Sequence, residues 1–280
     1  MKRFLFALVL LFTVTLAACN NSDDSSNDSS NEEASNDEVK KLTVVATPVP
    51  HAEILEEAKP LLEDKGIDLD IKVVNDYNTP NQMLESGDAN ATFFAHIPYF
   101  NNLLNEGFDF ENIGPVHLEP IGAYSNDYDS LEDLPDGAKV LISNNLPDEG
   151  RVLKFFVDHD LITLKDGVDP IEATLDDIEE NPHDFKFDNQ TAPEIMVKAY
   201  ENNEGDVFFI NSNYAIDSGL SPKEEAIELE AADSDYVNVV IVRSEDKDDE
   251  ALNTLVEVLQ SDDIKSFIDE NYDGAVISAE

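Results

Sequence analysis

Short apolar segments alternate along the chain with segments in which apolar residues recur every three or four positions. The short apolar runs predict buried strands, which we expect at residues 42–46, 69–74, 90–94, 121–124, 139–142, 207–210 and 237–242. The amphipathic spacing predicts helices at residues 151–158, 193–200, 250–260 and 261–271, the last of them capped by Ser261. This alternation predicts an α/β protein with mainly parallel sheets.

The segment after the first strand is also expected to be helical. Its apolar residues share one helical face: Ile54, Leu55, Ala58, Leu61 and Leu62. Pro60 lies within this segment and lacks the N–H group that a helix interior needs, so we expect it to kink the helix or to restart it.

Residues 1–18 have the layout of a secretory signal peptide. Lys2 and Arg3 precede an apolar run from Phe4 to Leu16, which is too short to span a bilayer comfortably. Two alanines then lead into Cys19, the only cysteine in the chain. The arrangement resembles the bacterial lipobox, so we expect Cys19 to be acylated with chains such as palmitate and to anchor the protein to the membrane. A plain signal peptide that is cleaved elsewhere is the alternative.

Residues 19–39 are expected to be a lipidated cysteine followed by a disordered acidic tether. From Asn20 to Glu38 the chain consists of Asn, Ser, Asp and Glu with a single alanine, and such a segment cannot bury enough surface to fold. The ordered part is expected from about residue 40 to the end, a length that suits one two-lobed protein or two small domains.

The chain is strongly acidic. Without residues 1–18 it retains 15 of its 17 basic residues against all 62 acidic residues, a net charge of −47. This charge excludes nucleic acid as a partner and disfavours close contact with anionic lipid. The acidic runs are interpreted as solvated surface, because the Asp-x-Asp-x-Asp-Gly pattern of a calcium loop is missing. Since salt screens repulsion between surface charges, we expect an acidic surface adapted to saline surroundings.

The sequence contains none of the common motifs for nucleophilic hydrolysis, for binding phosphate or dinucleotides, or for catalysis by zinc, so no enzymatic activity and no cofactor are expected. The candidate metal ligands are His51 with Glu53 and His117 with Glu119. Neither pair has a recognised spacing, and no metal site is expected.

Several loop segments concentrate aromatic, histidine and amide side chains: residues 47–54, 76–81, 91–99, 116–122, 149–151 and 210–215. Such side chains at strand ends and helix starts are where α/β proteins place ligands. Core packing is the alternative for Phe93 and Phe94, and local capping is the alternative for His51 and Asn213.

These segments closely resemble the methionine-binding lipoproteins of ABC importers, the NlpA-type lipoproteins, from Lys41 to Ile277. The most specific strings are Pro-His-Ala-Glu-Ile at residues 50–54 and Phe-Phe-x-His-x-Pro-Tyr at residues 93–99. The resemblance implies a two-lobed type II periplasmic-binding-protein fold with two crossover strands. It places residues 40–120 and 240–280 in lobe 1, and residues 121–239 in lobe 2 with the crossover strands.

The resemblance also implies a function without a chemical reaction. Methionine would bind between the lobes, which close by hinge motion, and would pass to an ABC permease and its ATPase subunit at the extracytoplasmic face of the cell membrane.

Seven residues match the ligand-binding positions of the family. Arg151 matches the arginine that binds the ligand carboxylate, for which its planar fork is suited, although a salt bridge to an acidic neighbour is the alternative. Asn213 is expected to contact the ammonium or carboxylate group, and the aromatic residues to surround the thioether. The seven are Tyr77, Phe94, His96, Tyr99, Arg151, Asn211 and Asn213.

Two departures from the family pattern leave the ligand open. Asp148 stands where the family usually has asparagine, and residues 189–194 lack the usual basic residue. A carboxylate at position 148 could favour a more cationic ligand or a short peptide. Another amino acid, a methionine-containing dipeptide, a surface lipoprotein with a role in adhesion and a lipid-anchored hydrolase are the alternatives.

Overall fold

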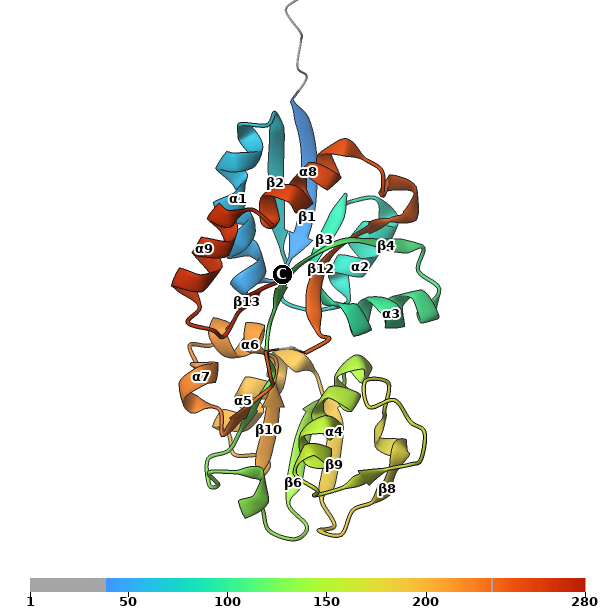
Figure 1. The fold of residues 1–280 in the computed structure, drawn as a ribbon, viewed down its shortest axis with the longest axis vertical. Helices are drawn as coiled ribbons and strands as arrows, with labels where there is room; N and C mark the ends of the chain where they lie inside the picture. The colour runs from blue at the N-terminus through green and yellow to red at the C-terminus, as the bar shows by residue number, and fades with distance from the viewer. Residues whose placement is uncertain (1–38, 233, 280) are drawn as a thin grey trace, which may run out of the picture. The chain divides into compact units, whose positions relative to one another are not determined.

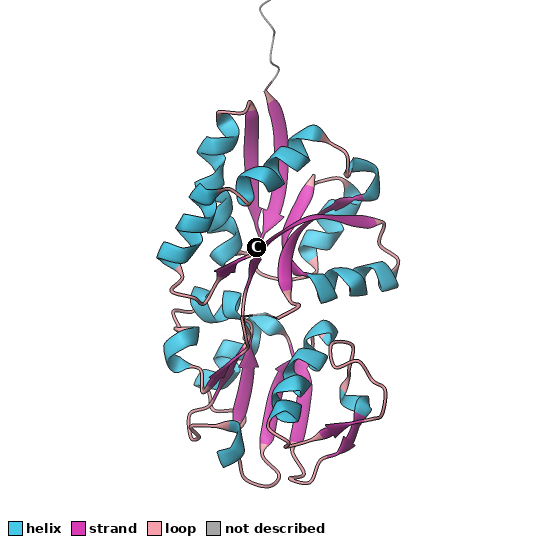
Figure 2. Cartoon of the chain, viewed as in Figure 1, coloured by secondary structure: helices cyan, strands magenta, loops and turns pink. Residues whose placement is uncertain are grey.

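The computed structural model describes residues 39–232 and 234–279, which form two large β-sheets flanked by helices and one two-stranded sheet (Figures 1 and 2). The predicted signal peptide, Cys19 and nearly all of the predicted tether lie outside the described residues. Within the described ranges, no helix combines the length and the apolar character needed to cross a membrane.

The first sheet has six strands in the order β13-β4-β12-β3-β1-β2. Strand β1 pairs in parallel with β2 and β3, whereas β12 runs antiparallel to β3 and β4, and β4 antiparallel to β13. The strands are β1 (Lys40–Ala46), β2 (Ile67–Val73), β3 (Ala91–His96), β4 (Phe110–Leu118), β12 (Val237–Arg243) and β13 (Ile277–Ser278).

Helices cover both faces of the first sheet and bury its central strands. Phe93 packs in one apolar cluster with residues of α1 and α8, whereas its neighbour Phe94 packs in another with residues of α2 and α3. Adjacent strand residues point to opposite faces, so a strand buried on both sides places both phenylalanines in a core. The helices are α1 (Glu53–Glu63), α2 (Thr79–Ser86), α3 (Ile97–Glu106), α8 (Glu250–Leu259) and α9 (Asp262–Asn271).

The second sheet has five strands in the order β11-β5-β10-β6-β9. Strand β6 pairs in parallel with β10 and β9, and β5 runs antiparallel to β10 and β11. The strands are β5 (Gly122–Tyr124), β6 (Lys139–Ser143), β9 (Lys186–Thr191), β10 (Val207–Ile210) and β11 (Glu228–Leu229), with β7 (Thr163–Leu164) and β8 (Ile178–Glu180) forming a separate antiparallel pair. The helices are α4 (Glu149–Asp158), α5 (Met196–Glu201), α6 (Ser212–Asp217) and α7 (Pro222–Glu225).

The prediction of mainly parallel sheets is wrong, because both sheets are mixed. Strands β3 and β10 end next to the places where β12 and β5 begin, with Asn238 opposite His96 and Gly122 opposite Ile210. A strand that enters a sheet at the carboxyl ends of its parallel strands has to run in the opposite direction. Each passage of the chain between the sheets therefore adds an antiparallel strand.

Two local expectations need correction. Of the two expectations for Pro60, the restart is wrong, because α1 is a single helix from Glu53 to Glu63 with Pro60 on its exposed face, where water can bond the carbonyl group that proline leaves unpaired. The expected kink stays a prediction. Strand β4 was not predicted, since Gly114 and Pro115 interrupt its apolar pattern and its pairing with β12 is irregular. The predicted cap of α9 is confirmed, because the Ser261 side chain accepts the backbone N–H of Ile264.

Leu153 and Leu104 allow a matched test of the second core. Leu153 in α4 is fully buried, whereas Leu104 in α3 is 42 % exposed. We expect Leu153→Ala to lower the free energy of unfolding by about 2–5 kcal/mol, and Leu104→Ala by less than about 1 kcal/mol. Urea unfolding in molar salt measures both, and equal losses would contradict the assignment of Leu153 to the core.

Candidate functional site

A small cavity lies between the two sheets, where β3, β10 and the start of α4 meet the segments that connect the sheets. All seven residues that the sequence predicted as ligand contacts line it: Tyr77, Phe94, His96, Tyr99, Arg151, Asn211 and Asn213. Their contact with a ligand stays a prediction. Five further lining residues were not predicted: Ala95, Glu119, Asn145, Ser212 and Asn238.

Three aromatic rings form one wall of the cavity. The ring centroids of Tyr77, Phe94 and Tyr99 lie 5.5–6.1 Å apart, within the range of favourable aromatic pairs. The Tyr99 hydroxyl donates to the Tyr77 carbonyl at 2.7 Å and accepts from Asn81 at 2.8 Å. Burial raises the pKa of Tyr99 to about 12 and the pKa of Tyr77 well above its usual value, so both phenols are neutral. The wall therefore suits an apolar, polarisable side chain.

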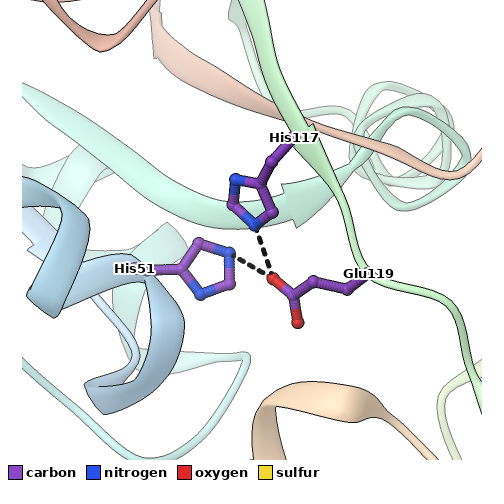
Figure 3. Close-up of side chains that lie close together, drawn as sticks. All are labelled: His51, His117 and Glu119. Carbon is purple, nitrogen blue, oxygen red and sulfur yellow. Dashed lines mark hydrogen bonds and ion pairs between the residues drawn. The ribbon is translucent and has the colours of Figure 1, made fainter. Parts of the chain in front are cut away.

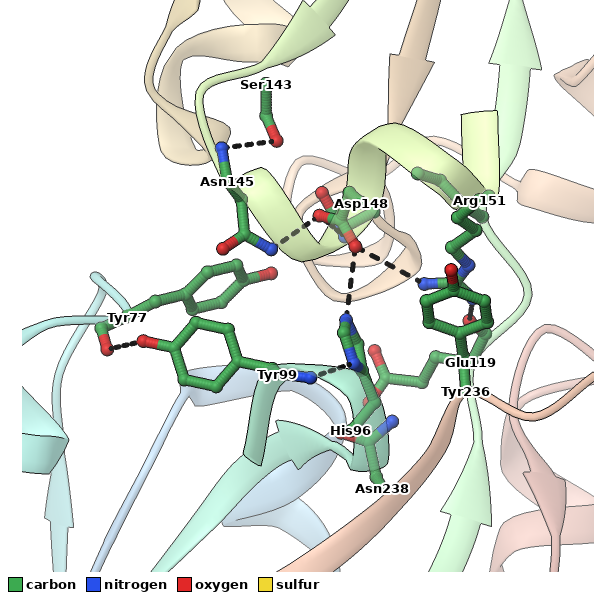
Figure 4. Close-up of polar contacts among 12 residues, drawn as sticks. Tyr77, His96, Tyr99, Glu119, Ser143, Asn145, Asp148, Arg151, Tyr236 and Asn238 are labelled. Carbon is green, nitrogen blue, oxygen red and sulfur yellow. Dashed lines mark hydrogen bonds and ion pairs between the residues drawn. The ribbon is translucent and has the colours of Figure 1, made fainter. Parts of the chain in front are cut away.

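Asp148 is held by protein groups from both sides of the cavity (Figure 4). It accepts hydrogen bonds from Asn145 at 2.7 Å, from Asn211 at 3.0 Å and from Nε2 of His96 at 3.1 Å. Burial would raise the pKa of Asp148, but the bond from His96, the charge of Arg151 and the other donors lower it to about 2. The carboxylate is thus saturated by the protein, which weakens the argument that it selects a more cationic ligand.

His96 connects the strand that ends at the cavity with the helix that follows. Its Nδ1 accepts the backbone N–H of Tyr99 at 3.1 Å and so caps α3. Since Nδ1 is an acceptor there, Nε2 carries the proton and donates to Asp148. The same ring therefore fixes a helix start and bridges to the second sheet.

Arg151 is 4 % exposed, and two of its three guanidinium nitrogens donate hydrogen bonds to other residues of the chain. Its Nε donates to Oε1 of Glu230 at 2.9 Å, and its Nη2 donates to Oε2 of Glu230 and to the Glu119 carbonyl. The Tyr236 ring centroid lies 4.5 Å from its Cζ. Nη1 lies 3.9 Å from Asp148 and makes no hydrogen bond within the described residues. Arg151 is thus both a buried salt-bridge partner and a donor facing the cavity.

His51, His117 and Glu119 converge beside the cavity, with their nearest ligand atoms within 4.8 Å of one another (Figure 3). Nε2 of His117 lies 2.7 Å and Nε2 of His51 lies 3.0 Å from the same oxygen of Glu119. A tetrahedral zinc site with bonds of about 2.1 Å separates its ligands by about 3.4 Å. The shorter separations fit hydrogen bonds to a carboxylate. Glu53 is directed elsewhere and accepts from the Tyr272 hydroxyl at 2.7 Å.

The sequence pattern around Asn238 could have identified it as a residue of the site. It is the one polar residue in the predicted strand at 237–242, it is 4 % exposed, and its Oδ1 lies 3.2 Å from Nε2 of His51. An isolated amide in a strand that is otherwise apolar needs a buried partner or a ligand. The sequence singled out Glu119 only as a candidate metal ligand beside His117, because its second partner, His51, meets it only in the folded chain.

Comparison with known proteins places the chain among lipoproteins. The profile of the NlpA lipoprotein family matches residues 42–280. The chain is 44 % identical over 279 residues to the methionine-binding lipoprotein MetQ of Bacillus subtilis strain 168, covering 99 % of this chain and 98 % of that protein.

Solved structures show the same likeness. A putative methionine-binding lipoprotein from Bacillus subtilis superposes with a TM-score of 0.84 at 46 % identity, covering 86 % of this chain and 98 % of that one. A nutrient-binding protein from Burkholderia cenocepacia bound to methionine superposes with a TM-score of 0.80 at 32 % identity, covering 85 % of this chain and all of that one.

Asp148→Asn tests the buried carboxylate through pH. Because the folded-state pKa of Asp148 is about 2, below the ordinary value of 3.8, the charge contributes stability that is present above about pH 4 and is lost as the pH falls through 2. We expect the variant to be less stable than the wild type by about 2 kcal/mol at pH 7, and this difference to shrink between pH 4 and pH 2.

Unfolding at a series of pH values measures this difference, with Asp248→Asn as the control. Asp248 is exposed and forms no hydrogen bond or ion pair with any described residue, so its removal should change stability little at every pH. A constant difference between wild type and Asp148→Asn from pH 7 to pH 2 would contradict the assignment.

Proposed function

The chain belongs to the NlpA lipoprotein family, and from this we propose that it is a substrate-binding lipoprotein that captures methionine and delivers it to an ABC permease with its ATPase subunit. The names of the similar proteins, which include a methionine-binding lipoprotein and a methionine-bound nutrient-binding protein, support this ligand. The function is capture and release and needs no chemical reaction.

The observation that carries the proposal is a cavity with a cationic donor at one side and an aromatic wall at the other. Nη1 of Arg151 is available for the α-carboxylate. Asn213, whose Oδ1 accepts from the Tyr77 hydroxyl at 2.9 Å, keeps its amide N–H groups for the same carboxylate. The thioether then packs against Tyr77, Phe94 and Tyr99, where each sulfur–aromatic contact contributes about 0.3–1.5 kcal/mol.

Delivery requires that the cavity opens. Glu119, Glu230 and Tyr236, which lie in the two connections between the sheets, contact Arg151 beside the cavity. These connections are the proposed hinges. Ligand favours closure only by binding the closed form more tightly than the open one. In the proposed cycle the closed form docks on the permease, and ATP hydrolysis by the partner subunit drives uptake.

The proposed location is the extracytoplasmic face of the cell membrane. Cys19, acylated after cleavage of residues 1–18, would provide the anchor, and residues 20–38 would separate the binding protein from the lipid surface. The net charge of −47 would keep the folded part away from anionic lipid. Methionine is a net-neutral zwitterion, so this charge does not repel it.

Arg151→Ala tests two claims directly: that methionine is the ligand, and that Arg151 binds its carboxylate. Loss of the carboxylate donor should weaken methionine binding on the order of 100-fold. We would measure it by calorimetric titration of the lipidated chain in detergent and molar salt, after unfolding and refolding to remove ligand that co-purifies. Because the substitution also leaves Glu230 unpaired, the melting temperature of the variant has to be recorded in parallel.

Arg243→Ala is the matched control. Arg243 donates to the carbonyls of Leu84 and Ala89 and does not line the cavity, so this variant should lose stability but keep its affinity for methionine. Near-normal affinity in Arg151→Ala would refute the role of Arg151. No heat from a folded wild-type chain would refute methionine as the ligand.

We also propose that the acidic surface is an adaptation to saline surroundings. Repulsion among the surface carboxylates is screened at 1 M salt, where the Debye length is about 3 Å. The melting temperature should therefore rise by about 5 °C or more between dilute buffer and 1 M NaCl. Calorimetric scans measure the shift, and sucrose at equal osmolality serves as the control without charge. A higher melting temperature in dilute buffer would contradict the adaptation.

A further inference from the structure

One oxygen of Glu119 is held by two histidines, and the other is not held by the protein. Glu119 is 7 % exposed and lines the cavity. Both imidazole contacts, at 2.7 Å and 3.0 Å, go to Oε1, whereas Oε2 has no hydrogen-bond partner within residues 39–232 and 234–279. Figure 3 shows this second oxygen pointing away from both rings. A carboxylate that is more than nine-tenths buried thus offers one oxygen to whatever occupies the cavity.

The Glu119 side chain carries a full negative charge. Burial would raise its pKa, but the neighbouring His51 and His117 outweigh burial and hold the pKa well below its usual range. A carboxylate oxygen only accepts hydrogen bonds, so each Nε2 that faces it carries a proton. Oε1 therefore accepts from two donors.

His117 does not neutralise this charge. Its Nδ1 is buried and has no hydrogen-bond partner in the described part of the chain, and burial lowers its pKa. Arg151 lies nearby, but its Nε and Nη2 are bound to Glu230. A buried carboxylate whose second oxygen has no partner within the described residues favours a positively charged group at that oxygen.

The position of Glu119 relative to Arg151 matches the two charged groups of an amino acid. The backbone carbonyl of Glu119 accepts from Nη2 of Arg151 at 2.5 Å, so the two residues are in direct contact at one end of the cavity. An α-amino acid carries its carboxylate and its ammonium on the same carbon atom. A carboxylate that binds Nη1 of Arg151 would place the ammonium group beside Glu119.

We propose that Oε2 of Glu119 accepts the α-ammonium group of the bound amino acid, and that His51 and His117 position this carboxylate. The inference rests on the proposed function and adds a requirement to it: the ligand must have a free, protonated amino group next to its carboxylate. N-acylated methionine fails this requirement, because its nitrogen is neutral and bulkier.

The test compares two ligands on wild type and Glu119→Gln. L-Methionine has the ammonium group, and 4-(methylsulfanyl)butanoate is the same molecule without it. The wild type should bind methionine at least tenfold more tightly than the butanoate. Glu119→Gln should weaken methionine binding about 10- to 100-fold and change butanoate binding less than threefold. Titration calorimetry on the full lipidated chain in detergent and molar salt gives all four affinities.

Glu149→Gln is the matched control for removal of a buried carboxylate. Glu149 is 5 % exposed and accepts from the backbone of Leu175 and from Asn189, and it does not line the cavity. This variant should bind methionine as the wild type does. A second comparison needs no variant: N-acetyl-L-methionine should bind the wild type at least tenfold more weakly than methionine.

The outcomes separate the inference from the function on which it rests. Methionine binding that is unchanged in Glu119→Gln, or equal weakening for both ligands, overturns the ammonium role while the methionine function stands. Stoichiometric binding of Zn²⁺ to the wild type, lost in Glu119→Gln, would assign the cluster to a metal and overturn the inference. A folded wild type that binds neither ligand contradicts the proposed function as well.

Discussion

The structure around the cavity depends on the buried charge of Arg151. A guanidinium that is 4 % exposed needs compensation, and it receives this from Glu230 and from the Glu119 carbonyl. Glu119 follows β4 and Glu230 precedes β12, so one side chain of α4 holds both segments that connect the two sheets. These contacts use Nε and Nη2 of Arg151, so that Nη1 is left facing the cavity. The same ion pair therefore fixes the connections between the sheets and orients the donor on which the proposed binding relies.

Local pattern predicted most elements of this fold, because burial imposes periodicity on the sequence. Strand β10 was predicted with its observed bounds, and the capped start of α9 was predicted from Ser261. Strand direction could not be predicted from local pattern, since an apolar run looks the same in parallel and antiparallel sheets. The resemblance to the NlpA lipoproteins is confirmed by the family profile, which spans nearly all of the described residues.

The candidate site was only partly predictable, because its key pairs are distant in sequence. Arg151 was expected to pair with a ligand or with an acidic neighbour, but its partner Glu230 is 79 residues away. His51 meets Glu119 across 68 residues, and the sequence had suggested Glu53 as its partner. Asp148 was recognised as unusual, yet its saturation by His96 and two asparagines depends on tertiary structure. The sequence gives the type of each residue, but it does not show which distant residues compensate a buried charge.

Two kinds of electrostatic interaction operate in this protein, and salt separates them. The surface carboxylates repel one another through water and are screened within a few ångströms in molar salt. The charges of Glu119, Asp148 and Arg151 are buried in contact with their partners, where mobile ions cannot enter. Direct bonds across the cavity, from Tyr77 to Asn213 and from His96 to Asp148, already join the two halves, so the ligand has to supply only the remaining free energy of closure. On the proposed function and the proposed adaptation to salt, high salt would therefore stabilise the fold while leaving recognition of a zwitterion largely intact.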